Sequence, residues 1–184
     1  MRVITGTAKG KRLITPEGRD VTRPTGEKVK EGIFSSIQFL IEGADVLDLF
    51  AGSGQLGIEA LSRGAKSAVF VDSAKVAQKC ITENLKNCGF TDVAKLKTGD
   101  ALMYLSSAFE RFDIAFLDPP YAAEQLPVVL PALSKVMRPG GVVLCETAKA
   151  IELPEEIGKL VKAKEYRYGS TKVLLKKIII YYQN

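Results

Sequence analysis

The residues with the clearest chemical potential are the consecutive Asp118, Pro119, Pro120 and Tyr121. They follow the apolar run 112–117, which has the length of a buried strand. A residue before a proline is extended, and each proline has a fixed φ and no N–H, so the segment forms a stiff corner. This corner can present the Asp118 carboxylate and the Pro119 carbonyl side by side, next to the flat face of Tyr121. Two acceptors and a stacking surface suit a planar ring with an exocyclic amine, although an ordinary turn that closes a strand explains these residues about equally well.

A glycine-rich loop is the second candidate site. It follows the apolar segment 46–50 and contains Gly52, Gly54 and Gly57, and Asp72 lies 20 positions after Gly52. This spacing matches the fingerprint of dinucleotide-binding loops, in which the distant acid holds a ribose. Any ligand that needs the backbone close selects glycine, however. The loop therefore predicts a nucleotide-like cofactor and leaves a nicotinamide or flavin cofactor open.

The acidic residues around this loop favour a positively charged ligand. Asp48 stands at the lip of the loop, where it would repel a pyrophosphate and attract an amine. Asp72, Asp100 and Asp118 follow at the ends of the next three expected strands. Each acid alone is explained as a helix N-cap or a solvated loop residue, but four at consecutive strand ends predict an acidic edge on one sheet.

Alternating strand-like and helical segments predict an α/β fold with a doubly wound, mostly parallel sheet. Two final strand-like segments, separated by Gly169, Ser170 and Thr171, predict an antiparallel hairpin at the end of a seven-stranded sheet. The expected strands are 46–50, 67–71, 93–98, 112–117, 142–146, 164–168 and 172–180, and the expected helices are 27–40, 55–63, 75–88, 101–109 and 126–136.

The amino-terminal segment stands apart from this alternation. Residues 2–5 and 11–15 are expected to pair as a small basic β-hairpin. We therefore expect an amino-terminal extension over residues 1–25 and one main domain over residues 26–184.

The formal net charge of +5 is unevenly distributed along the chain. Residues 1–23 carry a net charge of +4 and residues 159–177 carry +6, whereas the remainder sums to −5. Basic ends around an acidic middle suggest a polyanionic partner held at the edges of an acidic site, although a solvated basic surface is common.

The composition excludes several classes of protein. The chain has no histidine, which excludes an imidazole base or a histidine metal ligand. Cys80, Cys88 and Cys145 have no metal-ligand spacing and are expected to be reduced and buried. No apolar run is long enough to span a bilayer. We therefore expect a cytoplasmic protein that needs neither a metal nor a membrane.

With these motifs in place, the chain resembles the RsmD-type methyltransferases, which modify a guanine exocyclic amine in bacterial small-subunit (16S) ribosomal RNA. The resemblance covers nearly the whole length. Its most specific part is the amino-terminal block, since DNA methyltransferases with the same acidic corner usually carry a separate target-recognition region. Lys28 and Lys30, where arginines are expected, and Gly32 depart from the family pattern. The matching segments are 2–6, 9–13, 22–25, 47–54, 56–57, 59–64, 118–121 and 168–172.

The resemblance implies methyl transfer from S-adenosylmethionine to a guanine N2 amine, by a monomer that acts on ribosomal RNA or on a small-subunit assembly particle. The amine would be held by Asp118 and the Pro119 carbonyl, and the base would stack on Tyr121. The implied catalytic residues are Asp118, Pro119, Pro120 and Tyr121, the implied cofactor contacts are Arg23, Thr25, Asp48, Ala51, Gly52, Ser53, Gly54, Asp72, Ser73, Asp100 and Ala101, and the implied RNA contacts are Lys9, Lys11 and Arg12.

Three alternatives remain open on the sequence alone. The same chemistry could act on adenine N6 or cytosine N4, in DNA or another RNA. The glycine spacing supports a nicotinamide-dependent oxidoreductase. An RNA-binding protein could also keep the fold without catalysis, but binding alone has no need of the acidic corner.

Overall fold

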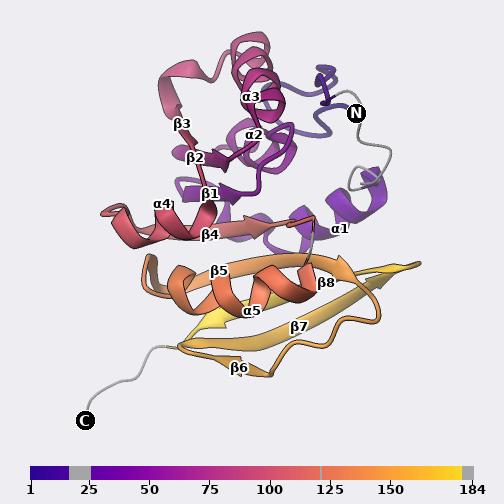
Figure 1. Cartoon of the computed structure of the whole chain (residues 1–184). Helices are drawn as coiled ribbons and strands as arrows, with labels where there is room; N and C mark the ends of the chain where they lie inside the picture. Colours follow the sequence, from indigo (N-terminus) through magenta and orange to yellow (C-terminus); the bar gives the residue numbers. More distant parts are fainter. Residues whose placement is uncertain (17–25, 121, 180–184) are drawn as a thin grey trace.

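The computed structural model describes residues 1–16, 26–120 and 122–179, and over these residues it shows an α/β fold built on one sheet (Figure 1). The sheet has eight strands in the order β3-β2-β1-β4-β5-β8-β7-β6. The pairs from β3 to β5 are parallel and the other pairs are antiparallel. The strands are β1 Asp45–Leu49, β2 Ser67–Asp72, β3 Ala94–Thr98, β4 Phe112–Leu117, β5 Met137–Ala148, β6 Glu156–Ile157, β7 Leu160–Tyr168 and β8 Thr171–Ile178.

The doubly wound sheet that ends in an antiparallel hairpin is thereby confirmed, with one strand more than the seven predicted. The additional strand is β6, whose two residues pair with the start of β7. Gly158 lies between β6 and β7 and has a φ of 61°, which lets the chain turn back directly. A two-residue strand is too short for a hydrophobic alternation, so no periodicity in the sequence marks it.

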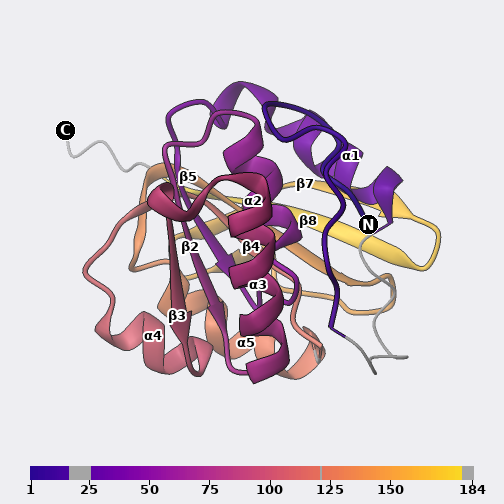
Figure 2. The same cartoon turned by 90° about the horizontal axis from the view of Figure 1, so that it is seen from above.

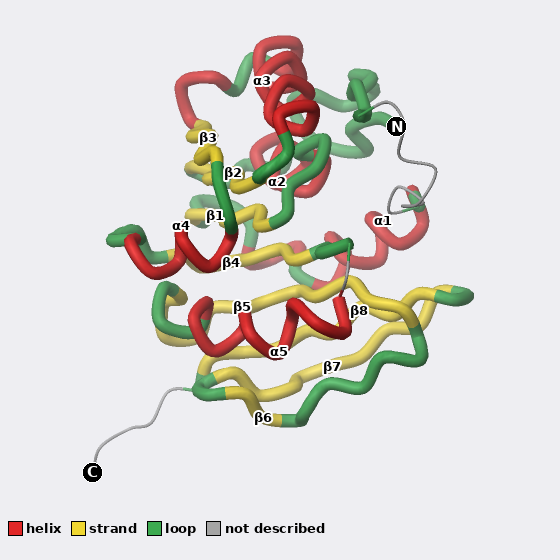
Figure 3. Tube along the Cα trace, viewed as in Figure 1, coloured by secondary structure: helices red, strands yellow, loops and turns green. Residues whose placement is uncertain are grey.

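Helices cover both faces of the sheet (Figures 1 and 3). The helices α1 Glu27–Ser36, α2 Gln55–Ser62 and α3 Lys75–Cys88 pack on one face, and α4 Ala101–Ser107 and α5 Ala122–Leu133 pack on the other. Successive residues of a strand point to opposite faces. Val46 of β1 therefore packs in the core between the sheet and helices α1 to α3, while Leu47 and Leu49 pack in the core on the face that α4 and α5 cover.

Helix α5 begins earlier than the prediction at residue 126 and contains two prolines. It starts at Ala122 and keeps Pro127 and Pro131 in its interior. Each proline removes a backbone donor from the helix. The helix is held against the sheet by its buried apolar side chains Leu126, Val129, Leu130 and Leu133.

Helix α1 is shorter than predicted and lies against the carboxyl-terminal hairpin. It ends at Ser36, because Ile37 leaves the helical conformation with a φ of −122°. Gly32 in the helix interior costs roughly 1 kcal/mol relative to alanine. A Cβ at this position would lie 1.9 Å from the Tyr168 hydroxyl oxygen. The glycine therefore allows α1 and the end of β7 to approach each other closely.

Residues 1–16, which we call the amino-terminal arm, lie beside α2 and α3 (Figure 2). The predicted β-hairpin is present in a short form, with one antiparallel bridge between Arg2 and Arg12. Next to this bridge, the Val3 N–H donates to the Lys11 carbonyl at 2.9 Å and the Leu13 N–H donates to the Met1 carbonyl at 3.0 Å. The turn of the hairpin packs against α2. At Gly6 a Cβ would lie only 1.7 Å from the Ser62 carbonyl oxygen, and the next N–H donates to that oxygen at 2.8 Å.

Glu59 of α2 anchors the amino-terminal arm. Its side chain is fully buried, and its carboxylate accepts hydrogen bonds from the backbone N–H groups of Ile4 at 2.8 Å and Thr5 at 3.0 Å. The cationic groups of Lys30 and Arg63 lie 3.4 and 2.9 Å from the same carboxylate. A buried charge is tolerated when it is paired and hydrogen-bonded. Glu59 is therefore a fully satisfied ionic centre to which the arm is attached.

Several lysines that count toward the formal net charge are buried inside the protein. Lys30 donates to a backbone carbonyl of the arm at 2.6 Å, Lys172 contacts the Glu152 carboxylate at 3.0 Å, and Lys176 donates to a backbone carbonyl at 2.7 Å. Burial lowers the pKa of Lys30 and of Lys176. The net charge of residues 159–177 therefore overstates the positive charge that this end of the chain exposes.

Glu59→Gln should destabilise the protein strongly, because it leaves the buried ammonium of Lys30 without a counter-ion. We expect the free energy of unfolding in urea to fall by about 3–5 kcal/mol. Glu27→Gln is the matched control, since Glu27 pairs with Arg2 at the surface, where the two side chains are 49% and 61% exposed. This control should lose less than about 1 kcal/mol. Equal losses in the two variants would show that Glu59 is no anchor.

Candidate functional site

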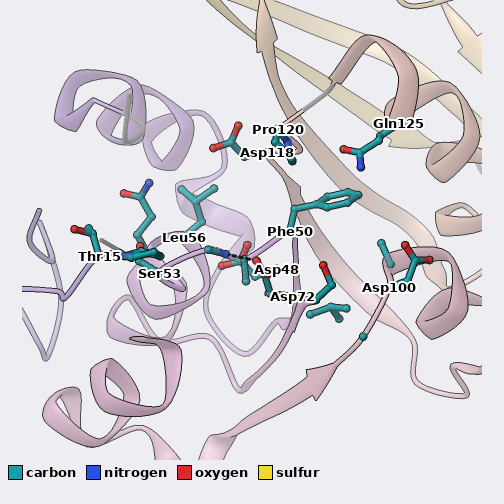
Figure 4. A pocket seen from close by; sticks show the side chains of 18 of the residues that line it. Thr15, Asp48, Phe50, Ser53, Leu56, Asp72, Asp100, Asp118, Pro120 and Gln125 are labelled. Carbon is teal, nitrogen blue, oxygen red and sulfur yellow. Dashed lines mark hydrogen bonds between the residues drawn. The ribbon is translucent and has the colours of Figure 1, made fainter. Parts of the chain in front are cut away.

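A cavity of about 250 Å³ opens at the carboxyl ends of β1, β2 and β4, between these strand ends and the amino-terminal arm (Figure 4). In an open α/β sheet this edge is where ligands bind. The lining comes from the glycine loop, the strand ends, the start of α4, the acidic corner and the arm. Its residues are Met1, Thr15, Pro16, Asp48, Phe50, Ala51, Gly52, Ser53, Gln55, Leu56, Val71, Asp72, Ser73, Gly99, Asp100, Ala101, Asp118, Pro120 and Gln125.

Strand register brings three carboxylates to one side of this cavity. Asp48 on β1 pairs with Phe70 of β2 and with Phe116 of β4. Asp72 and Asp118 each lie two residues beyond those partners, so all three acids share the face of the sheet that α2 covers. The predicted series at the strand ends therefore converges on one cavity (Figure 4).

Asp48 lies deeper than the sequence suggested. It was expected at the lip of the loop, but it belongs to β1, is 3% exposed and accepts a hydrogen bond from the Gly57 N–H at 2.8 Å. Burial raises the pKa of Asp48 to about 8. The hydrogen bond from Gly57 lowers this pKa in part, while the nearby charges of Asp118 and Asp72 raise it further. A positive charge in the cavity would offset this unfavourable electrostatic environment.

Asp72 and Asp100 also have local partners. The Asp72 carboxylate accepts from the Gly52 N–H and from the Ala74 N–H, each at 2.8 Å, and so ties the glycine loop to the end of β2. Asp100 caps α4 by accepting from the N–H groups of Leu102 and Met103 in the first turn of that helix. Asp100 is thus a helix N-cap, as each acid taken alone could be, and it also lines the cavity.

Each of the three glycines of the fingerprint is required for a different physical reason. Gly52 has a φ of 58°, and a Cβ there would meet nothing within 4 Å. Gly54 has a φ of 75° and precedes α2 without lining the cavity. A Cβ on Gly57 would lie 2.4 Å from the Phe70 ring. Only Gly52 therefore combines open space with a position at the cavity, while Gly54 and Gly57 serve the turn and the packing of α2.

The acidic corner borders the same cavity. Asp118 is partly buried, Pro119 is buried and Pro120 is exposed. Asp118 and Pro120 line the cavity, with Gln125 of α5 beside them (Figure 4). The corner therefore adjoins the acidic wall formed by the strand ends.

A family model described as Conserved hypothetical protein 95 matches residues 1–177. A Haemophilus influenzae protein named "Ribosomal RNA small subunit methyltransferase D" is 35% identical over 158 residues, which cover 81% of this chain and 79% of that protein. A Bacillus subtilis protein named "Putative rRNA methyltransferase YlbH" is 41% identical over 182 residues, which cover 96% of this chain and 98% of that protein. This chain belongs to the RsmD family of ribosomal RNA methyltransferases.

Solved structures agree with this assignment of the RsmD fold. The Escherichia coli protein yhhF superposes with a TM-score of 0.85 at 26% identity, covering 97% of this chain and 98% of that one. A conserved hypothetical protein of Streptococcus pyogenes gives a TM-score of 0.76 at 39% identity, over 82% of this chain and 95% of that one. A more distant structure described as complexed with SAH has a TM-score of 0.67 at 16% identity, so its likeness concerns the fold alone.

Most residues predicted for the RsmD cofactor site line the cavity, and the predicted RNA contacts lie elsewhere. Lys9 and Arg12 are exposed on the arm, and Lys11 donates to the Asn87 carbonyl at the end of α3. The predicted residues that line the cavity are Asp48, Ala51, Gly52, Ser53, Asp72, Ser73, Asp100, Ala101, Asp118 and Pro120. Gly54 and Pro119 are not among its lining residues, and Arg23, Thr25 and Tyr121 lie outside the described residues.

Several lining residues carried no signal in the sequence. The side-chain Oε1 atoms of Gln55 and Gln125 are buried and have no hydrogen-bond partner within the described part of the chain. Phe50 has a φ of 64°, a conformation that is rare for a bulky residue and that marks functional sites. The two amide oxygens can accept hydrogen bonds from a ligand, while an isolated glutamine or phenylalanine in a sequence indicates nothing of this kind.

No helix in the described part of the chain is long and apolar enough to cross a membrane. No group of three or more cysteine, aspartate or glutamate side chains in residues 1–16, 26–120 and 122–179 is placed to hold a metal ion.

Asp48→Asn should make the ligand-free protein more stable, increasingly so as the pH rises. The pKa of Asp48 is about 8 in the folded protein and 3.8 as a reference. Between these values the folded state binds a proton that the unfolded state has lost, so stability falls with rising pH, by at most about 1.4 kcal/mol per pH unit. Urea unfolding from pH 5 to 8 should show a growing advantage of the variant. Asp92→Asn, at an exposed carboxylate, is the control. An advantage of Asp48→Asn that does not change with pH would contradict the assignment.

Gly52→Ala and Gly57→Ala should separate ligand binding from packing. Gly57→Ala should lower the free energy of unfolding by about 1–3 kcal/mol, because its Cβ would overlap the buried Phe70 ring. Gly52→Ala should cost about 1 kcal/mol for the left-handed φ but should weaken the binding of S-adenosylhomocysteine at least tenfold. Calorimetric titration and urea unfolding give the two quantities. The same ratio of lost affinity to lost stability in both variants would refute the division of roles.

Proposed function

We propose that this protein transfers a methyl group from S-adenosylmethionine to the exocyclic N2 amine of a guanine in small-subunit ribosomal RNA. The observation that carries the proposal is the convergence of Asp48, Asp72 and Asp118 on one cavity that the Asp118–Pro120 corner borders. Membership in the RsmD family supports ribosomal RNA as the substrate class. The proposed substrate implies that the protein acts in the cytoplasm.

The cavity fits the cofactor of this family. S-adenosylmethionine supplies, when bound, an electrophilic methyl group on a positively charged sulfur. Asp72 lines the cavity beside Asp48, whose carboxyl would give up its proton and become negative when a cationic ligand binds. The buried Oε1 of Gln55 offers an unpaired acceptor. Gly52 leaves the backbone of the loop open to the ligand. The remaining proposed cofactor contacts are Arg23, Thr25, Ala51, Ser53, Gly54, Ser73, Asp100 and Ala101.

The acidic corner activates the target amine by positioning it. The lone pair of a nucleobase amine is delocalised into the ring, so the amine is a poor nucleophile. Hydrogen bonds from the amine to the Asp118 carboxylate and the Pro119 carbonyl would localise that lone pair and aim it at the methyl group. Pro119 and Pro120 fix the directions of these acceptors. No residue has to act as an imidazole base, in agreement with the absence of histidine.

The target base reaches the corner only when it is exposed or turned out of its stack. Tyr121 would then stack on the base, a contact worth on the order of 1–3 kcal/mol. Lys9 and Arg12 are exposed on the arm and would hold RNA phosphates, with Lys11 nearby on the same turn. Such contacts position the RNA without reading its sequence.

The experiment that tests the function is a product analysis. The protein is incubated with S-adenosylmethionine that carries a labelled methyl group. Each reaction contains one candidate substrate, which is small-subunit ribosomal RNA, small-subunit particles or DNA. We expect labelled N2-methylguanosine from the RNA or the particles. Label in N6-methyladenosine, or in DNA, would assign the chain to another branch of amine methylation, and no label in any sample would overturn the proposal.

Asp118→Ala should lose most methyl transfer while the protein stays folded. Removing an acceptor aimed at the reacting amine should lower kcat about 10²–10³-fold, with only a modest loss of S-adenosylhomocysteine affinity. Tyr121→Phe, the control at the corner, should remain active because the ring and not the hydroxyl makes the proposed contact. A folded Asp118→Ala protein with near-normal transfer would refute this mechanism.

The double variant Lys9→Ala/Arg12→Ala should weaken RNA binding and flatten its dependence on salt. Two lost phosphate contacts should reduce the slope of log K against log salt by about 1.4–1.8. Lys164→Ala, at an exposed lysine of β7, is the control and should change neither quantity. Affinity for S-adenosylhomocysteine should be unchanged in both proteins. An unaltered salt slope in the double variant would exclude the arm as the docking element.

A further inference from the structure

The end of the amino-terminal arm returns to the cofactor cavity. Thr15 and Pro16 line that cavity together with Ser53 of the glycine loop, and Met1 lines it from the start of the arm. Thr15 and Ser53 are both labelled among the side chains around the cavity (Figure 4). The arm therefore carries exposed basic side chains in its middle and contributes one wall of the cavity with its ends.

Asn84 of α3 joins the arm to the glycine loop. Its side chain is fully buried, its Oδ1 accepts from the Ile14 N–H at 2.8 Å, and its Nδ2 donates to the Ile14 carbonyl at 2.8 Å. The same Nδ2 donates to the Ser53 carbonyl at 2.9 Å. The two bonds to Ile14 fix its backbone as a neighbouring strand would, and the third bond reaches the loop. Only an amide offers both an acceptor and two donors in this arrangement.

The first half of the arm is held separately. The Ser62 hydroxyl accepts from the Ala8 N–H at 3.0 Å and donates to the Thr5 carbonyl at 2.6 Å, next to the Glu59 anchor. These contacts lie on α2 and support the turn that carries the basic residues. Two different side chains, Ser62 and Asn84, thus hold two different parts of the arm on two different helices.

We propose that residues 14–16 of the arm are part of the S-adenosylmethionine site, and that Asn84 is the positioning residue that holds them against the glycine loop. The inference rests on the proposed function and deepens it. The arm then contacts RNA with one segment and the cofactor with another. We expect bound S-adenosylhomocysteine to hold the end of the arm in place and so to raise the affinity for RNA. Because linkage is reciprocal, bound RNA should then raise the affinity for S-adenosylhomocysteine by the same factor.

The alternative explanation is that Asn84 only satisfies buried backbone groups. Loss of Asn84 would then reduce stability and would affect cofactor and RNA binding together, as any general loosening does. A comparison of Asn84→Ala with Ser62→Ala separates the two explanations. Both variants remove buried hydrogen bonds to the arm, but at different segments. Asn87→Ala, at an exposed position of α3, controls for a change on that helix.

The experiment measures S-adenosylhomocysteine binding by calorimetry and small-subunit ribosomal RNA binding by fluorescence anisotropy, below the unfolding temperature of each variant. Asn84→Ala should weaken S-adenosylhomocysteine binding at least tenfold, keep RNA affinity without the ligand within twofold, and abolish the gain in RNA affinity that the ligand gives the unmodified protein. Ser62→Ala should weaken RNA binding at least threefold and keep S-adenosylhomocysteine affinity within twofold. Asn87→Ala should change neither.

Thr15→Phe tests the same wall without a change in the core, because Thr15 is exposed. It should weaken S-adenosylhomocysteine binding at least tenfold even if Asn84→Ala fails to fold. The inference is overturned if S-adenosylhomocysteine affinity stays within twofold in Thr15→Phe, or if Asn84→Ala and Ser62→Ala weaken both ligands equally. Failure of the unmodified protein to bind S-adenosylhomocysteine would instead overturn the proposed function.

Discussion

The burial of a carboxylate at the centre of the sheet is the constraint on which the site depends. Asp48 is 3% exposed, lies between two strands that carry Asp72 and Asp118, and has its pKa raised to about 8. Such an arrangement works against the stability of the ligand-free protein, so it is expected where function requires it. A cationic ligand relieves it, whereas the pyrophosphate of a dinucleotide would add to it.

The glycine loop and the arm are built around this centre. Gly57 donates its N–H to Asp48, Asp72 receives the N–H of Gly52, and Asn84 carries the link from the loop to the arm. A second buried carboxylate, Glu59, attaches the other half of the arm to α2. The arm that we propose to hold RNA and the glycine loop that we propose to hold the cofactor therefore both contact helices α2 and α3, so one small domain would serve both ligands.

The sequence predicted the parts of this structure that follow from periodicity. Helix α3 and strand β4 have the predicted bounds 75–88 and 112–117, because their apolar residues recur at helical and buried-strand spacing. The acidic residues were found because parallel strands end at one edge. Contacts between distant segments determine the other features. These are the burial of Asp48, Lys172 and Lys176 and the hydrogen bonds through which Asn84 joins the arm to the glycine loop. No local pattern of residue types encodes such contacts, so they became visible only in the fold.

We infer that the cavity selects a cationic cofactor through Asp48. The decisive measurement is the number of protons exchanged when S-adenosylmethionine binds, obtained by calorimetry at pH 6.5 in buffers with different heats of ionisation. At this pH the amine of the ligand is already protonated, while Asp48 holds a proton that the positive charge should expel. We expect a binding heat that depends on the buffer and corresponds to the release of about one proton, and no such dependence in Asp48→Asn. A binding heat that is the same in all buffers for the unmodified protein would contradict it.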